Sequence, residues 1–101
     1  MNSRQGLWLR TRQFGKAYVI TDTYQNGGAL AVEIVVESDE TSNVLSVNLP
    51  EFSHLLGEGE FFAKTWSENE EIAEDALASG HFRDTGRSSG DFLNARIWAF
   101  S

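Results

Sequence analysis

The residues best able to do chemistry in this sequence are two histidines and a serine. His54 follows Ser53 directly, whereas His81 lies much further along the chain. A serine nucleophile needs a base at hydrogen-bond distance and an oxyanion hole, and adjacency in the sequence creates neither. We therefore expect no catalytic residue and no enzymatic activity. The alternative is an active site where the two histidines and the glycine-containing loops converge.

Metal and cofactor chemistry has equally little support. The chain has no cysteine, which excludes thiolate chemistry and any zinc site that needs sulfur. Asp39 and Glu40 could offer oxygen atoms to calcium, but the spaced Asp/Asn pattern of a calcium loop is missing. Residues 86–90 contain two glycines, as a phosphate loop does, yet the lysine and helix that should follow are absent. We expect neither a metal nor a cofactor.

Negative charge is the strongest remaining signal. The formal net charge is -7 at pH 7, and residues 33–75 hold twelve acids with a single base, Lys64. The four bases of residues 1–16, where no acid occurs, are Arg4, Arg10, Arg12 and Lys16. Nucleic-acid binding depends on Lys and Arg neutralising phosphates. We therefore expect no direct binding of nucleic acid, and a partner protein with a basic surface instead.

The acidic run coincides with an expected helix. Ser67 and Glu70 have the spacing of a capping box at a helix start, and Gly80 is placed to end the helix. The apolar stripe of this helix should consist of Ile72, Ala73, Ala76 and Leu77. The side chains that should then face water are Glu70, Glu71, Glu74 and Asp75.

The rest of the chain has the alternation of short strands. We expect strands at residues 7–12, 17–24, 29–37, 44–49, 60–66 and 93–100, with a short extended piece at 81–86. Asn26 and Gly27 predict a two-residue type I′ hairpin turn, and Pro50 should end the strand before it. The expected fold is a single α+β domain over residues 1–101. It is an antiparallel β-meander of five or six strands, with one late α-helix packed on one face.

The segment organisation also bears on location. We find no signal-peptide core and no apolar run near the roughly 20 residues that cross a bilayer. The lack of cysteine fits a reducing compartment. We therefore expect a cytoplasmic protein with no membrane partner.

Three stretches carry a family resemblance. Residues 47–50 (VNLP), 59–70 (GEFFAKTWSENE) and 84–87 (DTGR), with a closing aromatic strand, resemble a family of small uncharacterised proteins of bacterial plasmids and phages. The resemblance runs from about Phe14 to Phe100, and its most specific parts are residues 66–70 and 85–87. It implies a small accessory protein of a mobile element in the bacterial host cytoplasm, and it brings no catalytic residues.

These observations lead to a functional hypothesis. The expected partner-binding residues are Glu70, Glu71, Glu74 and Asp75 on the helix, with Asp39 and Glu40 in a turn. Gathered into one continuous patch, they would mimic nucleic acid and inhibit a host defence protein, such as a nuclease, restriction or CRISPR component. This is an anti-restriction or anti-CRISPR type of function. The alternative is a self-associating structural protein, in which the basic N-terminal strand meets the acidic region of a second copy. An acidic face that only keeps the chain soluble also fits the composition.

Overall fold

The computed structural model describes the backbone of residues 2–91 and 93–101, and the side chains of residues 7–91 and 93–101. The strands are β1 (Asn2–Thr11), β2 (Gly15–Thr23), β3 (Leu30–Val36), β4 (Ser42–Val44), β5 (Glu60–Ala63), β6 (Phe82–Ser88) and β7 (Arg96–Phe100). The helices are the 3-10 helices η1 (Pro50–Leu55) and η2 (Ser67–Asn69) and the α-helix α1 (Glu70–Ala78).

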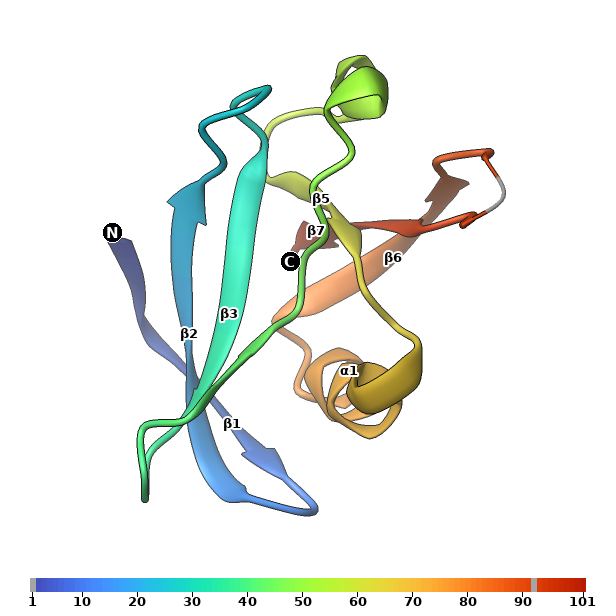
Figure 1. Cartoon of the computed structure of the whole chain (residues 1–101). Helices are drawn as coiled ribbons and strands as arrows, with labels where there is room; N and C mark the ends of the chain where they lie inside the picture. Colours follow the sequence, from blue (N-terminus) through green and yellow to red (C-terminus); the bar gives the residue numbers. More distant parts are fainter. Residues whose placement is uncertain (1, 92) are drawn as a thin grey trace.

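The strands form two antiparallel sheets (Figure 1). Sheet A has the order β1-β2-β3-β4, and sheet B has the order β5-β7-β6. The α+β class is thus confirmed. The expectation of a single meander of five or six strands is wrong, because the meander ends at β4 and the later strands form their own sheet.

The change of sheet takes place just after β4. Here we expected a strand at residues 44–49, and only Val44 of that span belongs to β4. The Leu45 N–H still donates to the Val32 carbonyl of sheet A at 2.8 Å, but the Leu45 carbonyl accepts a bond from the Lys64 N–H at 2.7 Å. The Val47 N–H then donates to the Phe62 carbonyl at 2.9 Å. The alternating pattern is real, but the segment divides its hydrogen bonds between two sheets.

The hairpin between β2 and β3 is confirmed, but not its predicted turn. The Tyr24 N–H donates to the Ala29 carbonyl at 2.8 Å, so the loop is longer than two residues. The positive φ angles belong to Gly27 (93°) and Gly28 (72°) instead of Asn26 and Gly27. A Cβ on Gly27 would lie 3.2 Å from Pro50. The loop therefore packs against the start of η1.

The core lies between the two sheets. Sheet A contributes Leu9, Ala17, Val19, Val32 and Ile34. Sheet B contributes Phe61, Ala63, Phe82 and Trp98. The rings of Phe61, Phe82 and Trp98 contact one another, with centroids 5.8–6.2 Å apart. Edge-to-face and tilted ring pairs of this kind add stability beyond the burial of apolar area. Trp98, in the closing strand β7, is thus a core residue.

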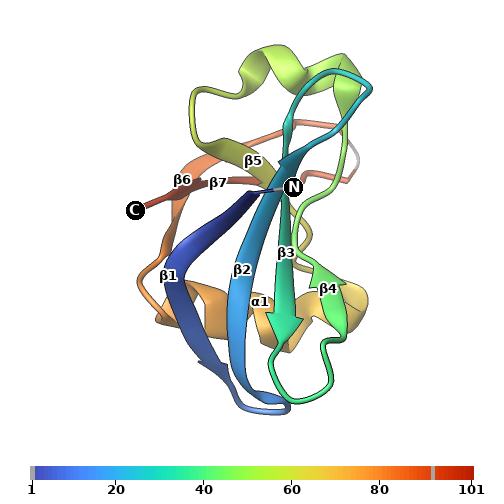
Figure 2. The ribbon, with the colours of Figure 1, turned by 90° about the vertical axis from the view of Figure 1, so that its left-hand side faces the viewer.

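The helix closes the space between the sheets at one end. It contacts β1 of sheet A and β6 of sheet B, and Figure 2 shows it behind the lower part of sheet A. The expected packing of the helix on one face of a single sheet is therefore wrong. With nine residues, α1 is the longest helix in the described part of the chain, so none of the helices there could cross a membrane.

Candidate functional site

The helix start differs from the predicted capping box. Ser67 lies in η2 with a φ of 59°, and no side chain caps the first turn of η2 or of α1. The residue before α1 is Asn69, which is only 1% exposed. Its Nδ2 group donates to the Val44 carbonyl at 2.7 Å and to the Lys64 carbonyl at 3.1 Å. Asn69 therefore ties the start of α1 to the end of β4.

The inward face of α1 agrees with the prediction at three positions out of four. Ile72, Ala73 and Ala76 are buried, whereas Leu77 is 38% exposed. Asp75 was expected to face water, and this expectation is wrong because it is 8% exposed. Asp75 follows Ile72 by three residues, so the two share a face of the helix. That face meets the end of β1.

Arg12 is the residue that makes burial of Asp75 possible. Its backbone N–H donates to Oδ2 of Asp75 at 3.0 Å, and its Nε donates to Oδ1 at 2.7 Å. Its Nη2 donates to Glu74 Oε1 at 2.9 Å and to the Glu71 carbonyl at 3.2 Å. The hydrogen bonds to Glu74 and Asp75 raise the pKa of Arg12 above its usual value. Two of the four helix carboxylates are therefore neutralised within the chain.

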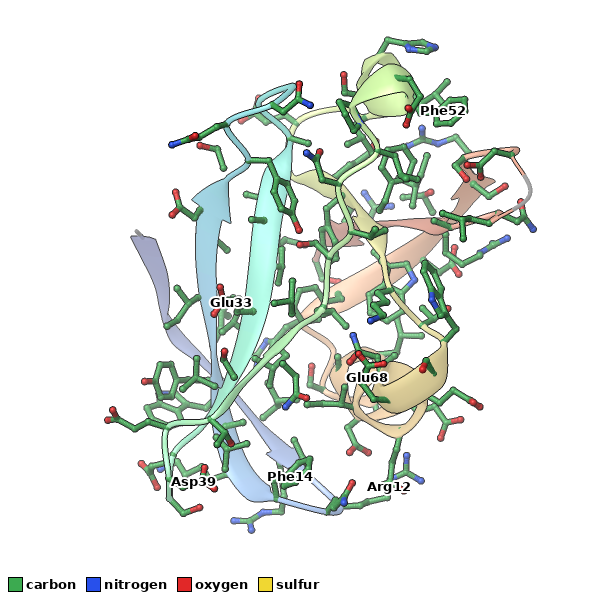
Figure 3. All side chains as sticks on the ribbon, in the orientation of Figure 1. Arg12, Phe14, Glu33, Asp39, Phe52 and Glu68 are labelled. Carbon is green, nitrogen blue, oxygen red and sulfur yellow. The ribbon has the colours of Figure 1, made fainter. Side chains whose placement is uncertain are left out.

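The turn between β1 and β2 presents Arg12 to the helix. Thr11 is buried, and its hydroxyl donates to the Gly15 carbonyl at 3.0 Å and accepts a bond from the Phe14 N–H at 2.9 Å. These bonds close the turn between Thr11 and Gly15. Figure 3 shows Arg12 directed from this turn towards α1.

The carboxylates that remain on the helix surface are Glu70 and Glu71. Both are exposed and lie in the first turn of α1. Neither forms an ion pair with a described side chain. Glu68, just before them, pairs with Lys64 at 2.6 Å, and this hydrogen bond lowers the pKa of Glu68 to about 2. A negatively charged side chain near the N-terminal end stabilises a helix, by about 0.3–1 kcal/mol per exposed residue.

Asp39 and Glu40 lie in the turn between β3 and β4. Oδ1 of Asp39 accepts bonds from the Thr41 N–H at 3.1 Å and the Thr41 hydroxyl at 2.8 Å. These bonds lower the pKa of Asp39. Figure 3 shows Asp39 well apart from Glu68. The six expected binding residues thus form two groups, which contradicts the single continuous patch.

Much of the positive charge of the chain is paired with carboxylates of the same chain. The pairs are Arg12 with Glu74 and Asp75, Lys64 with Glu68, Arg87 with Glu60, and Arg96 with Asp84. The carboxylates that form no ion pair with a described side chain are Asp22, Glu33, Glu37, Asp39, Glu40, Glu51, Glu58, Glu70, Glu71 and Asp91. The described cations that likewise form no ion pair with a described side chain are Arg10, Lys16 and Arg83. The side chain of Arg4 lies outside the described residues.

The two histidines do not converge. His54 lines a cleft of about 410 Å³ between the β2–β3 loop and the segment after η1. The hydroxyl of its neighbour Ser53 donates to the Pro50 carbonyl at 3.0 Å, so it is not held by the imidazole. His81 lies just before β6, and its Nε2 forms a 2.7 Å hydrogen bond with the Trp8 carbonyl of β1. The geometry gives no support to a site shared by these residues. The described residues contain no group of three or more side chains that could hold a metal ion.

Two residues of the resemblance segments hold the fold together. Arg87 donates to the Leu55 carbonyl at 2.9 Å and to Glu60 Oε2 at 2.5 Å, and thereby joins β6 to η1 and β5. Asn69 joins η2 to β4, as described above. Sequence reasoning did not identify Arg12 or Asn69 as key residues. Only the presence of Asn69 in the most specific segment of the resemblance pointed towards one of them.

Comparison of the chain with protein-family models, with curated proteins and with solved structures yields no match.

Proposed function

We propose that the protein acts by binding a partner protein with a basic surface, and that it catalyses no reaction. The observation that supports partner binding is the surplus of carboxylates that form no ion pair with a described side chain. There are ten of them, against three described cations without such a pair. At physiological salt, charges act over roughly 8 Å. A surface of this kind speeds the encounter with a basic partner and repels phosphates.

Glu70 and Glu71 form the centre of the proposed contact. Both are exposed and belong to the first turn of α1, which is anchored at its start by Asn69. Asp39 and Glu40 supply a second, separate contact at the β3–β4 turn. Glu74 and Asp75, which we first expected in the contact itself, act on it indirectly because their bonds to Arg12 hold α1 against the β1–β2 turn.

The specific form of the proposal is an inhibitor of a host protein that handles nucleic acids. The resemblance to plasmid and phage proteins motivates this choice, with a nuclease, a restriction enzyme or a CRISPR component as the target. The exposed carboxylates would occupy the groove that normally binds phosphates. The protein would then work in the cytoplasm of a bacterial host.

The alternative, self-association through the basic strand β1, loses one of its cations. Arg12 is already paired with Asp75 of its own chain, so it is not free to meet the acidic region of a second copy. Arg10 is then the described cation of β1 that forms no ion pair with a described side chain.

DNA cleavage assays test the proposal. A panel of restriction endonucleases and CRISPR effector complexes is incubated with the protein, and substrate cleavage is followed on gels. We expect the wild-type protein to inhibit at least one of them, and the variant Glu70→Lys/Glu71→Lys to lose this inhibition at least about tenfold. A matched variant, Glu51→Lys/Glu58→Lys, changes the net charge equally at exposed sites elsewhere.

The control variant should inhibit nearly as well as the wild type. Equal loss in both variants would reduce the effect to net charge and would remove the helix from the proposal. If no enzyme of the panel is inhibited by the wild type, the inhibitor form is wrong.

A further inference from the structure

In the described part of the chain, no element covers the outer face of sheet A. Figure 2 shows this sheet face-on, with α1 and sheet B behind it. The strand registers place Trp8 beside Tyr18 and Tyr18 beside Val35, in one row across three strands. Their neighbours along the strands, such as Leu9 and Val19, point the other way into the core.

Several side chains that this face presents to solvent are apolar. Trp8 is 40% exposed and Val44 is 46% exposed, while Tyr18 and Ile20 are half-buried. The rings of Trp8 and Tyr18 pack with centroids 5.1 Å apart, and Lys16 Nζ lies 4.5 Å from the Trp8 ring centroid. Glu33 lies between Ile20 and Val44 in the neighbouring row, so the apolar part of the face centres on Trp8 and Tyr18. Exposed apolar patches with a polar rim mark interaction sites on soluble proteins.

Charge on the same face is separated by sign along β2. The outward residues of this strand are, in order, Lys16, Tyr18, Ile20 and Asp22. Arg10 is the register partner of Lys16, so two cations lie together at one end of the face. The exposed Glu37 lies beside Lys16 at this end, where its N–H donates to the Lys16 carbonyl at 2.9 Å. Glu33 is the partner of Ile20 and lies towards the end that carries Asp22. These cations are two of the three described ones that form no internal ion pair.

We propose that the outer face of sheet A binds a second copy of the same chain in a two-fold dimer. A two-fold axis that lies in the interface and runs across the strands reverses the strand direction of the partner. Lys16 then faces Asp22 of the second copy, and Tyr18 faces its Ile20. The pattern of β2 is therefore complementary to itself.

The size of the face sets the strength of this dimer. β2 has nine residues, which at about 3.3 Å each give a length of about 30 Å, and four strands span about 14 Å. Each copy would thus bury about 400–450 Å². The total is below the roughly 1,200 Å² of stable interfaces. We expect a dimer that dissociates in the micromolar to millimolar range. It uses a different face from the contact proposed for α1, so either proposal can fail without the other.

Sedimentation equilibrium of the full chain from about 10 μM to 1 mM tests the dimer. We expect Lys16→Asp and Asp22→Lys each to weaken association at least about tenfold, because each brings like charges together. The double variant Lys16→Asp/Asp22→Lys restores the opposite charges and the wild-type net charge. It should associate within about threefold of the wild type.

Two controls separate the interface from net charge. Arg83→Asp has the same charge change as Lys16→Asp, at an exposed site of sheet B, and should leave association within about threefold. Val44→Lys replaces an exposed apolar side chain of the face, next to Glu33, by a charged one and should weaken association. A wild type that stays monomeric at 1 mM, a double variant as weak as the singles, or an Arg83→Asp variant as weak as Lys16→Asp would each overturn the proposal.

Discussion

Replacing Asn69 by alanine should destabilise the protein strongly, although the residue is polar and lies next to a surface helix. The substitution removes hydrogen bonds of 2.7 Å to the Val44 carbonyl and 3.1 Å to the Lys64 carbonyl at a site that is 1% exposed. Each bond contributes about 1 kcal/mol net, and a buried carbonyl left without a donor costs about 1–3 kcal/mol. The free energy of unfolding should fall by about 2–4 kcal/mol, which corresponds to a drop in Tm on the order of 10–20 °C for a domain of this size.

Thermal and urea unfolding followed by circular dichroism measure this effect. Asn48→Ala is a matched control, because its Nδ2 makes one exposed hydrogen bond to the Asn26 carbonyl at 3.0 Å. It should lose less than about 1 kcal/mol. Asn69→Asp keeps the volume but places an acceptor against two carbonyls, so it should be at least as unstable as Asn69→Ala. If Asn69→Asp is as stable as the wild type, the side chain only fills space and the reasoning is refuted.

Two further predictions concern the ion pairs. Asp75→Ala should lower Tm by several degrees and Glu74→Ala hardly at all, because the side chain of Asp75 is 8% exposed and that of Glu74 is 71% exposed; equal effects in parallel melts would contradict the assigned role of Asp75. Hydrogen bonds from Lys64 to Glu68 and from Arg87 to Glu60 lower both carboxylate pKa values, that of Glu68 from 4.5 to about 2. This contribution to stability is present above pH 4.5 and is lost as the pH falls towards 2. Tm measured from pH 7 to pH 2.5 should therefore fall less steeply in Glu60→Gln than in the wild type, and identical slopes would contradict it.

Local patterns predicted the elements better than their arrangement. The closing strand and the hairpin between β2 and β3 could be recognised because alternation and turn residues act over a few positions. Which sheet a strand joins depends on contacts between distant segments. The stretch after Val44 shows this, since the same alternation that indicates a strand says nothing of its hydrogen bonds to Phe62 and Lys64.

The candidate site was predictable in composition but not in geometry. Glu70 and Glu71 are exposed, as the helical period indicates. Asp75 was misplaced because a periodic pattern assigns every polar residue to the wet face, whereas a charged partner can stabilise one at the boundary of the core. That partner, Arg12, lies 63 residues away in the sequence. No local signal connects the two.

Zero-length carbodiimide cross-linking can detect a contact of Glu70 and Glu71 with a basic partner, because it joins a carboxylate to a lysine in contact with it. The protein is incubated with bacterial lysate and cross-linked, and the modified carboxylates are mapped by mass spectrometry. We expect cross-links from Glu70 and Glu71 to lysines of one or a few basic proteins, and we expect them to disappear when cross-linking is done at 0.5 M salt. Cross-links confined to Glu51 and Glu58, or unchanged by salt, would contradict it.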